Sequence, residues 1–235
     1  TDSQTGIDHY ELNIDESGFT TRTSPYTISP DLAEGTHTIT VRAYDNAGNF
    51  RDGTILTINI DLTSPDAFIP TLNVSSPTSN TRPTVSFSTT DNFLMSYYQV
   101  KVDEGSFSTQ TSPYQVPQLS AGDHTITVRA FDAAGNYTDG EPNLVNIDES
   151  GPDAFTPSLS PVSPTNDTTP DLSFSTTDNN GIDYYQVKID SGSFSTQTSP
   201  YTLPTLTAGS HTATVRAFDL LGNYTDGSIS IVIDT

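Results

Sequence analysis

Apolar and polar residues alternate with period two through much of the chain. In residues 97–102, Tyr98, Val100 and Val102 fall on one side of an extended segment, with Gln99 on the other. A half-buried strand has this alternation because successive side chains point to opposite faces. The same alternation returns in three further segments, at residues 9–15, 124–130 and 184–190. We find no helical period of useful length, so the pattern predicts an all-β protein.

Three near-copies of one segment set the organisation of the chain. "HTITVRAYDNAGNFRDG", "HTITVRAFDAAGNYTDG" and "HTATVRAFDLLGNYTDG" begin at His37, His124 and His211. The repeat is therefore 87 residues long (211 − 124), which suits a small independent domain and is too long for a solenoid unit. We expect three domains, at residues 1–62, 63–148 and 149–235.

Seven short strands per repeat, separated by turn residues, predict tandem seven-stranded immunoglobulin-like β-sandwiches. In the second repeat we expect strands A to G near residues 67–74, 83–89, 97–103, 106–110, 113–117, 123–131 and 137–147. The first copy has no counterpart of strands A and B, which predicts an open half-sandwich. We expect the missing strands to lie in a longer protein ahead of "TDSQTGIDHY"; donation by another chain, as in a head-to-tail filament, is the alternative.

The motifs resemble a known family. "SPYTLPTLTAGSHTATVRAFDLLGNYTDG" followed by "IVIDT" is similar to the bacterial immunoglobulin-like repeats strung in tandem along large extracellular adhesins and other surface proteins. The specific parts are the G-x-H-T-x-x-V-R-A strand, the D-x-x-G-N corner and the "ID" ending before a linker with "PDAF". The resemblance covers nearly the whole chain. It implies the fold, a bacterial surface or secreted location, and calcium at domain junctions that stiffens the array.

The composition narrows the classes of partner. The formal net charge is −21, with eight Lys and Arg, and there is no Cys. Such acidity opposes binding to nucleic acid or anionic membranes. The absence of Cys excludes disulfides and thiolate zinc sites. No apolar run approaches the roughly 20 residues of a membrane span, so we expect no direct membrane insertion.

Acidic residues gather at the ends of the predicted domains. In an antiparallel sandwich the loop before strand C, the loop after strand F and the incoming linker meet at one end. Calcium accepts six to eight oxygens in tolerant geometry, so we predict one Ca2+ at each interdomain junction. The expected ligands are Asp61, Asp66, Asp91 and Asp132 at the first junction, and Asp148, Asp153, Asp178 and Asp219 at the second.

Plain turn chemistry is the alternative explanation for this acidic corner, because Asp and Asn side chains bond their own loop backbone. In the first copy only Asp2 and Asp45 match the pattern. Asn136 and Asn223 are expected to add an oxygen. The recurring His at the start of strand F is expected to be structural, with its polar tip bonded to nearby backbone.

Other chemistry is weakly supported. No nucleophile elbow, H-E-x-x-H or phosphate-binding Gly loop occurs, and we expect no enzyme. Aromatic and basic residues share the outer face of strands C and F, namely Tyr97, Lys101, Arg129 and Phe131, repeated as Tyr184, Lys188, Arg216 and Phe218. They suit a glycan ligand or lateral self-association, or else the Lys and Arg stems simply cover the rings.

These observations predict a structural stalk of an extracellular bacterial adhesin or surface filament, with adjacent repeats of the same protein as its partners. The alternative is a carbohydrate-binding or accessory module of a secreted enzyme.

Overall fold

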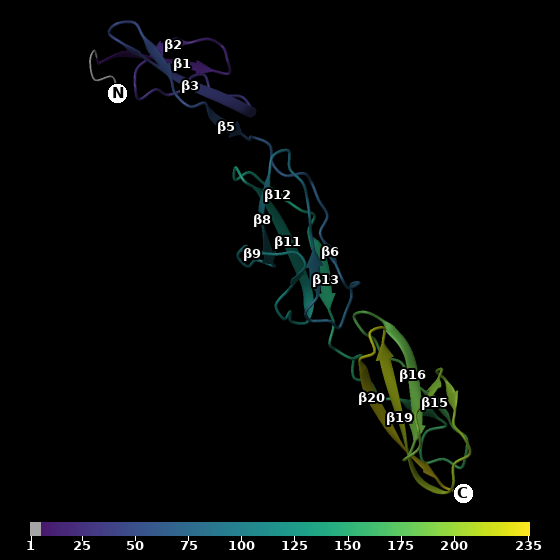
Figure 1. The fold of residues 1–235 in the computed structure, drawn as a ribbon. Coiled ribbons are helices and arrows are strands. Elements are labelled where there is room, and N and C mark those ends of the chain that lie inside the picture. The colour runs from purple at the N-terminus through teal and green to yellow at the C-terminus, as the bar shows by residue number, and fades with distance from the viewer. Residues whose placement is uncertain (1–5) are drawn as a thin grey trace.

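The computed structural model describes residues 6–235, and this part of the chain contains strands and no helix. It therefore also contains no helix of the length and apolarity needed to cross a membrane. Figure 1 shows the repeats following one another along an elongated molecule, with the N- and C-termini at opposite ends. The predicted all-β class is confirmed.

The first repeat holds β1 (Ile7–Ile14), β2 (Thr20–Arg22), β3 (Gly35–Asp45), β4 (Phe50–Asp52) and β5 (Leu56–Ile60). The second holds β6 (Thr71–Leu72), β7 (Thr84–Ser86), β8 (Met95–Val102), β9 (Ser108–Gln110), β10 (Tyr114–Gln115), β11 (Gly122–Asp132), β12 (Tyr137–Asp139) and β13 (Asn143–Ile147). The third holds β14 (Ser158–Ser160), β15 (Asp171–Ser173), β16 (Ile182–Ile189), β17 (Ser195–Gln197), β18 (Tyr201–Thr202), β19 (Gly209–Asp219) and β20 (Tyr224–Ile233).

The second and third repeats each consist of two antiparallel sheets. In the second repeat the sheets run β10-β7-β6 and β12-β11-β8-β9, and β13 pairs with β11. In the third they run β14-β15-β18 and β17-β16-β19-β20. The predicted last strand is broken into β12 and β13 in the second repeat but continuous as β20 in the third. The first repeat is broken at the same place, between β4 and β5, where Ile55 stands at the position of Pro142. The missing N–H of Pro142 is therefore not by itself the cause of the break.

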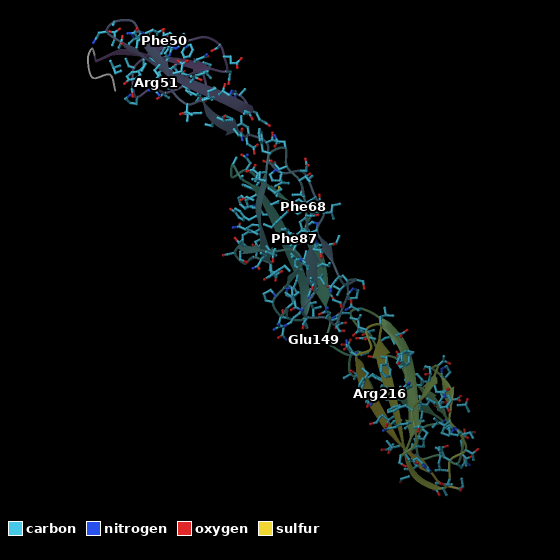
Figure 2. The ribbon with its side chains drawn as sticks, viewed as in Figure 1. Phe50, Arg51, Phe68, Phe87, Glu149 and Arg216 are labelled. Carbon is cyan, nitrogen blue, oxygen red and sulfur yellow. The ribbon has the colours of Figure 1, made fainter. Side chains whose placement is uncertain are left out.

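The predicted inward faces form two separate cores. On β11, Ile126, Val128 and Ala130 are fully buried, as their alternation indicates. They pack with Val85 and Phe87 from the opposite sheet, and Figure 2 shows Phe87 and Phe68 within this repeat. The third repeat has the equivalent core, with Leu172, Phe174, Val187, Ala213, Val215 and Ile231 among its members.

The first repeat consists of a single sheet. Its strands run β2-β1-β3-β4, with β5 also paired to β3, and no second sheet covers them within residues 6–235. Val41 is consequently 39% exposed, whereas its equivalent Val128 is fully buried. The strands that all three repeats share thus belong to a closed sandwich in the second and third repeats and to an open sheet in the first.

Candidate metal sites at the repeat junctions

The D-x-x-G-N corner forms a tight loop after the long central strand of every repeat. In the second repeat, Asp132 Oδ1 accepts hydrogen bonds from the backbone N–H groups of Gly135 (2.6 Å) and Asn136 (2.9 Å). Asp132 Oδ2 accepts from Asn136 Nδ2 at 2.8 Å. Gly135 has φ +97°, which a residue with a Cβ rarely adopts. Asp45 and Asp219 hold their loops with similar bonds, but Oδ1 accepts from the N–H two residues on, Ala47 or Leu221, in place of the glycine N–H. Turn chemistry therefore explains part of the repetition of this corner.

Three carboxylates from three chain segments meet at each junction. Asp61, Asp91 and Asp132 each bring an oxygen within 4.8 Å of the others, and so do Asp148, Asp178 and Asp219. In each triad one residue lies after the last strand of the preceding repeat, one lies in the loop before β8 or β16, and one ends β11 or β19. The structure therefore brings together six of the eight predicted residues.

Asp66 and Asp153 lie outside these triads. The Asp66 side chain accepts a hydrogen bond from Thr90 Oγ1 at 2.6 Å, and its N–H donates to the Thr90 carbonyl at 2.9 Å. Asp153 makes the same pair of bonds with Thr177. Both residues thus tie the incoming linker to the loop before the third strand of their repeat. Asp2 lies outside the described residues.

Burial makes the triads electrostatically costly. Asp132, Asp148 and Asp219 are 2%, 5% and 1% exposed. No ion pair joins any of the six carboxylates to a Lys, Arg or His within residues 6–235. Carboxylates taken out of water without a positive partner are unfavourable.

Two signs of this cost appear at the first junction. Desolvation raises the pKa of the Asp61 carboxyl above its usual range, and the charges of Asp91, Asp132 and Glu34 raise it further. Asp91 Oδ1 is buried without a hydrogen-bond partner, and no other side-chain oxygen or nitrogen in the described chain is in that position. Clustered carboxylate oxygens with one unpaired acceptor fit a hard cation that prefers oxygen ligands, as Ca2+ does.

The corner asparagines have a role that was not among the expectations. Asn136 Nδ2 points at the linker, where it lies 3.2 Å from the Asp61 carbonyl oxygen and 3.1 Å from that of Thr63. Asn223 Nδ2 lies 3.4 Å from the Asp148 carbonyl oxygen. These amides donate to the linker and clamp it onto the next repeat. The recurrence of Asn at the end of each corner is the sequence signal for this clamp.

Two junction residues were missed by sequence reasoning. Glu34 accepts hydrogen bonds from Thr63 Oγ1 at 2.7 Å and from Asn92 Nδ2 at 2.5 Å, so it joins the first repeat to the second. At the second junction, Asn180 Nδ2 donates to Asp148 Oδ2 at 2.7 Å. Neither residue recurs at the equivalent position of the other junction, where Ala121 and Phe93 stand, so the repeat pattern contains no signal for them.

The recurring histidines fasten one corner of each repeat. His124 Nδ1 bonds Asp103 Oδ2 at 2.8 Å, and Nε2 bonds the Ser120 carbonyl oxygen at 2.9 Å. The hydrogen bond to Asp103 is the main cause that raises the pKa of His124. His37 and His211 make the equivalent pairs of contacts. The expected contact with nearby backbone is present.

The aromatic and basic residues of the outer face satisfy one another. The Arg129 guanidinium lies 4.3 Å from the ring centre of Phe107 and 4.1 Å from that of Tyr137. It also donates to both carboxylate oxygens of Asp139, at 2.6 and 2.9 Å. Tyr97 stacks on Phe131. The third repeat has the same arrangement around Arg216, which is labelled in Figure 2. These contacts favour the interpretation that the Lys and Arg side chains cover the rings. They argue against the alternative, in which the rings form a free sugar-binding surface.

Comparison with known proteins gives a family for part of the chain. A family model described as a bacterial Ig-like domain matches residues 9–62. No curated protein matches the chain.

Similar solved structures include a 1.5-MDa bacterial ice-binding adhesin studied for host cell surface retention. It shares 14% identity over 100% of this chain and 89% of that chain, with TM-score 0.49. A tetra-tandem repeat in the extending region of a large adhesion protein shares 22% identity over 98% and 67%, with TM-score 0.36. The fibronectin(III)-like modules of Clostridium thermocellum CbhA share 16% over 71% and 94%, with TM-score 0.37. These similarities concern the fold alone.

The resemblance drawn from the sequence is therefore confirmed: residues 9–62 form a bacterial Ig-like domain, and residues 63–235 repeat its strand and corner motifs twice.

Proposed function

We propose that this chain is a stalk segment of an extracellular bacterial surface protein, in which one Ca2+ at each junction holds consecutive Ig-like repeats in line. We retain the division into residues 1–62, 63–148 and 149–235, with adjacent repeats as the direct partners. The observation that carries the proposal is the pair of aspartate triads, one at each junction, in which the first aspartate belongs to one repeat and the other two to the next.

The electrostatics explain why a cation would stiffen the array. Without one, three carboxylates within 4.8 Å repel each other, and this repulsion favours separation of the linker from the loops below it. A bound Ca2+ would be coordinated by the same carboxylates and would so link the two repeats. At free calcium 100 times Kd, each site would stabilise the bound form by about 2.7 kcal/mol, a large fraction of the 5–15 kcal/mol typical of a domain.

The fold is suited to a stalk. The repeats succeed one another along the molecule with the termini at its two ends (Figure 1), so each added repeat lengthens it. The outer Arg and aromatic side chains are engaged within each repeat, as expected for a module whose function is reach. We propose no catalytic role for the segment.

Calcium dependence tests the proposal. We expect thermal unfolding of the whole chain to shift upward in calcium relative to EDTA, and small-angle scattering to show a narrower distribution of molecular lengths. The double variant Asp91→Asn, Asp178→Asn removes a carboxylate from each triad and should abolish both effects.

The matched control is Asp66→Asn, Asp153→Asn, because these aspartates share the linkers but lie outside the triads. It should retain the calcium response. Identical unfolding and scattering with calcium and with EDTA would refute the calcium part of the proposal, and equal loss in both double variants would show that the triads are not the sites.

A further inference from the structure

The segment that enters the second repeat and the segment that leaves it lie next to each other and run in the same direction, with Thr78 and Ile147 in a parallel bridge. The Thr78 N–H donates to the Asn146 carbonyl at 3.0 Å, and the Asp148 N–H donates to the Thr78 carbonyl at 3.0 Å. The Asn146 N–H donates to Ser76 Oγ at 2.9 Å. We call these three hydrogen bonds the terminal contact.

The third repeat has the same terminal contact, with Thr165 and Ile233 in the parallel bridge. Its three bonds run from the Thr165 N–H to the Val232 carbonyl (3.0 Å), from the Asp234 N–H to the Thr165 carbonyl (2.9 Å) and from the Val232 N–H to Ser163 Oγ (2.8 Å). In both repeats the contact therefore joins the chain that arrives from one end of the repeat to the chain that departs at the other.

Tension along the molecule would act on the terminal contact in shear. The entering segment is pulled from its N-terminal side and the leaving segment from its C-terminal side, because the termini lie at opposite ends of the elongated chain (Figure 1). Two parallel segments pulled in this way slide along each other, so the bonds between them bear the force together. Segments pulled sideways would instead lose their bonds one at a time.

The second repeat extends this contact along the whole of its leaving segment. Five further hydrogen bonds end on carbonyl oxygens of residues 61–70. They run from Asn136 Nδ2 to Asp61 and Thr63 (3.2 and 3.1 Å), from Thr138 Oγ1 to Pro65 (2.6 Å), from the Glu141 N–H to Phe68 (3.2 Å) and from Asn143 Nδ2 to Pro70 (3.1 Å). Four of the five join residues 73 positions apart, so the two segments keep one register.

The third repeat makes one bond of this additional kind within residues 6–235. Asn223 Nδ2 lies 3.4 Å from the Asp148 carbonyl oxygen. Two differences explain the smaller number. Ile229 stands at the register position of Asn143 and has no amide to donate. Strand β20 is continuous and pairs with β19 throughout, whereas the break between β12 and β13 leaves the Glu141 N–H outside the ladder and bonded to the entering segment.

From these contacts we infer that the second repeat resists tension more strongly than the third, so that a stretched chain gives way in the third repeat first. The inference deepens the stalk function proposed above and rests on it, since the difference matters only in a chain that is held at both ends. Forced unfolding is governed by the unfolding rate, and bonds that break before the transition state slow it. At a given force the second repeat should unfold at least about tenfold more slowly than the third.

The test is single-molecule force spectroscopy on the whole 235-residue chain, pulled from its two ends. It is carried out in EDTA, so that no cation contributes to the resistance. We expect the two closed sandwiches to give two unfolding events at different forces. Each event should release about 300 Å of extended chain, as a repeat of 87 residues does.

Substitutions assign the two events to repeats. Ser76→Ala removes one acceptor of the terminal contact and should speed the stronger event about fivefold at a given force, the factor that corresponds to about 1 kcal/mol. Ser163→Ala should do the same to the weaker event. Thr138→Val with Asn143→Ala removes two of the additional bonds and should move the stronger event toward the weaker one. Thr225→Val is the matched control, because this equivalent of Thr138 donates no hydrogen bond to the entering segment within residues 6–235.

A second control separates resistance to force from overall stability. Ser112 Oγ and Ser199 Oγ accept from the N–H groups of Phe87 and Phe174 at 2.8 Å, and each serine precedes a proline, as the serines of the terminal contacts do. Neither bond joins an entering to a leaving segment. Ser112→Ala and Ser199→Ala should lower the midpoint of chemical unfolding as much as the contact variants do, but should leave the unfolding rate under force within about twofold.

Three results would overturn the inference. The first is two events at the same force. The second is a stronger event that Ser163→Ala shifts and Ser76→Ala does not, since the greater resistance would then lie in the third repeat. The third is an equal change of rate in the contact and control variants, because resistance would then follow overall stability. Identical traces in calcium and in EDTA would count against the calcium part of the proposed function alone.

Discussion

The two junctions use the same aspartate triad in different surroundings. At the first, Glu34 brings a fourth carboxylate near Asp61, and Asp91 Oδ1 has no partner. Both junctions have a linker N–H that donates to the first aspartate, Thr63 to Asp61 and Ser150 to Asp148, and the second adds Asn180 Nδ2 at 2.7 Å and Ser150 Oγ at 3.2 Å from Asp148. The first junction therefore has more negative charge and fewer donors, and the second is already partly neutralised by amide dipoles.

The comparison indicates how tandem repeats can vary the strength of a junction while keeping its ligands. The repeated corner supplies Asp132 and Asp219 with the same bonds to the corner asparagine, and residues outside the repeat pattern adjust the charge around them. More carboxylates raise calcium affinity in oxygen-ligand sites. We accordingly expect the first junction to depend more strongly on calcium than the second.

The largest effect is expected from Asp132→Ala and Asp219→Ala, measured in EDTA. Each removes a buried acceptor of three loop hydrogen bonds and leaves their donors unsatisfied. Each should lower the free energy of unfolding of its own repeat by about 2–4 kcal/mol. Hydrogen exchange of the core amides, read repeat by repeat, measures the loss. Similar values at both sites would establish the corner as the common part of the junctions, and a loss below about 1 kcal/mol would contradict the role of these bonds.

A smaller effect is expected from Asn180→Ala. It removes the amide donor from Asp148, which is 5% exposed, and should destabilise the third repeat by about 1–2 kcal/mol in EDTA. Calcium should recover most of the loss. Phe93→Asn at the equivalent position of the first junction is the reciprocal change and should reduce the calcium dependence there. If Asn180→Ala lowered stability equally with and without calcium, the amide would have no part in balancing the triad.

The smallest effect is expected from pH at the first junction without calcium. Because the pKa of Asp61 is raised in the folded chain, the folded state binds more protons than the unfolded state. The contribution of Asp61 to stability is therefore greatest below its unfolded pKa of about 3.9 and is lost as pH rises through its folded pKa. Glu34→Gln removes one of the charges that raise this pKa. It should therefore narrow the pH range between the unfolded and the folded pKa of Asp61, over which this contribution is lost.

NMR titration of Asp61 measures this pH range directly, and an unchanged titration in Glu34→Gln would show that Glu34 does not act on it. Titration of the corner histidines does not interfere with the measurement on Asp61. The pKa values of His37, His124 and His211 are raised, so their contribution is complete below about 6.5 and is lost only as pH rises above that value.

Much of the fold was predictable because it depends on local pattern. The alternation along residues 124–130 identified the buried face of β11, and Ile126, Val128 and Ala130 are all fully buried. The spacing of the repeats predicted that each corner aspartate recurs in the same loop. The split of the last strand was missed. It occurs in two copies, one with Ile55 and one with Pro142 at the same position, so no single residue type in the sequence signals it.

The candidate site was predictable to a smaller extent. The three loops were expected to meet at one end of the sandwich, and six aspartates do so. Asp66 and Asp153 were included because they are acidic and close in sequence, but their side chains bond Thr90 and Thr177. Linker residues only a few positions apart point in different directions, and sequence spacing does not determine which direction each takes.

The sequence alone determined the strand pattern, the repeat and the resemblance to bacterial Ig-like domains, because these follow from side-chain periodicity and from motifs that are read along the chain. Only the tertiary structure decided which of the predicted aspartates join each triad and which amides face them. These properties depend on contacts between residues far apart in the chain, such as Asn180 with Asp148, 32 positions apart, and Asn92 with Glu34, 58 positions apart, and no local pattern specifies such contacts.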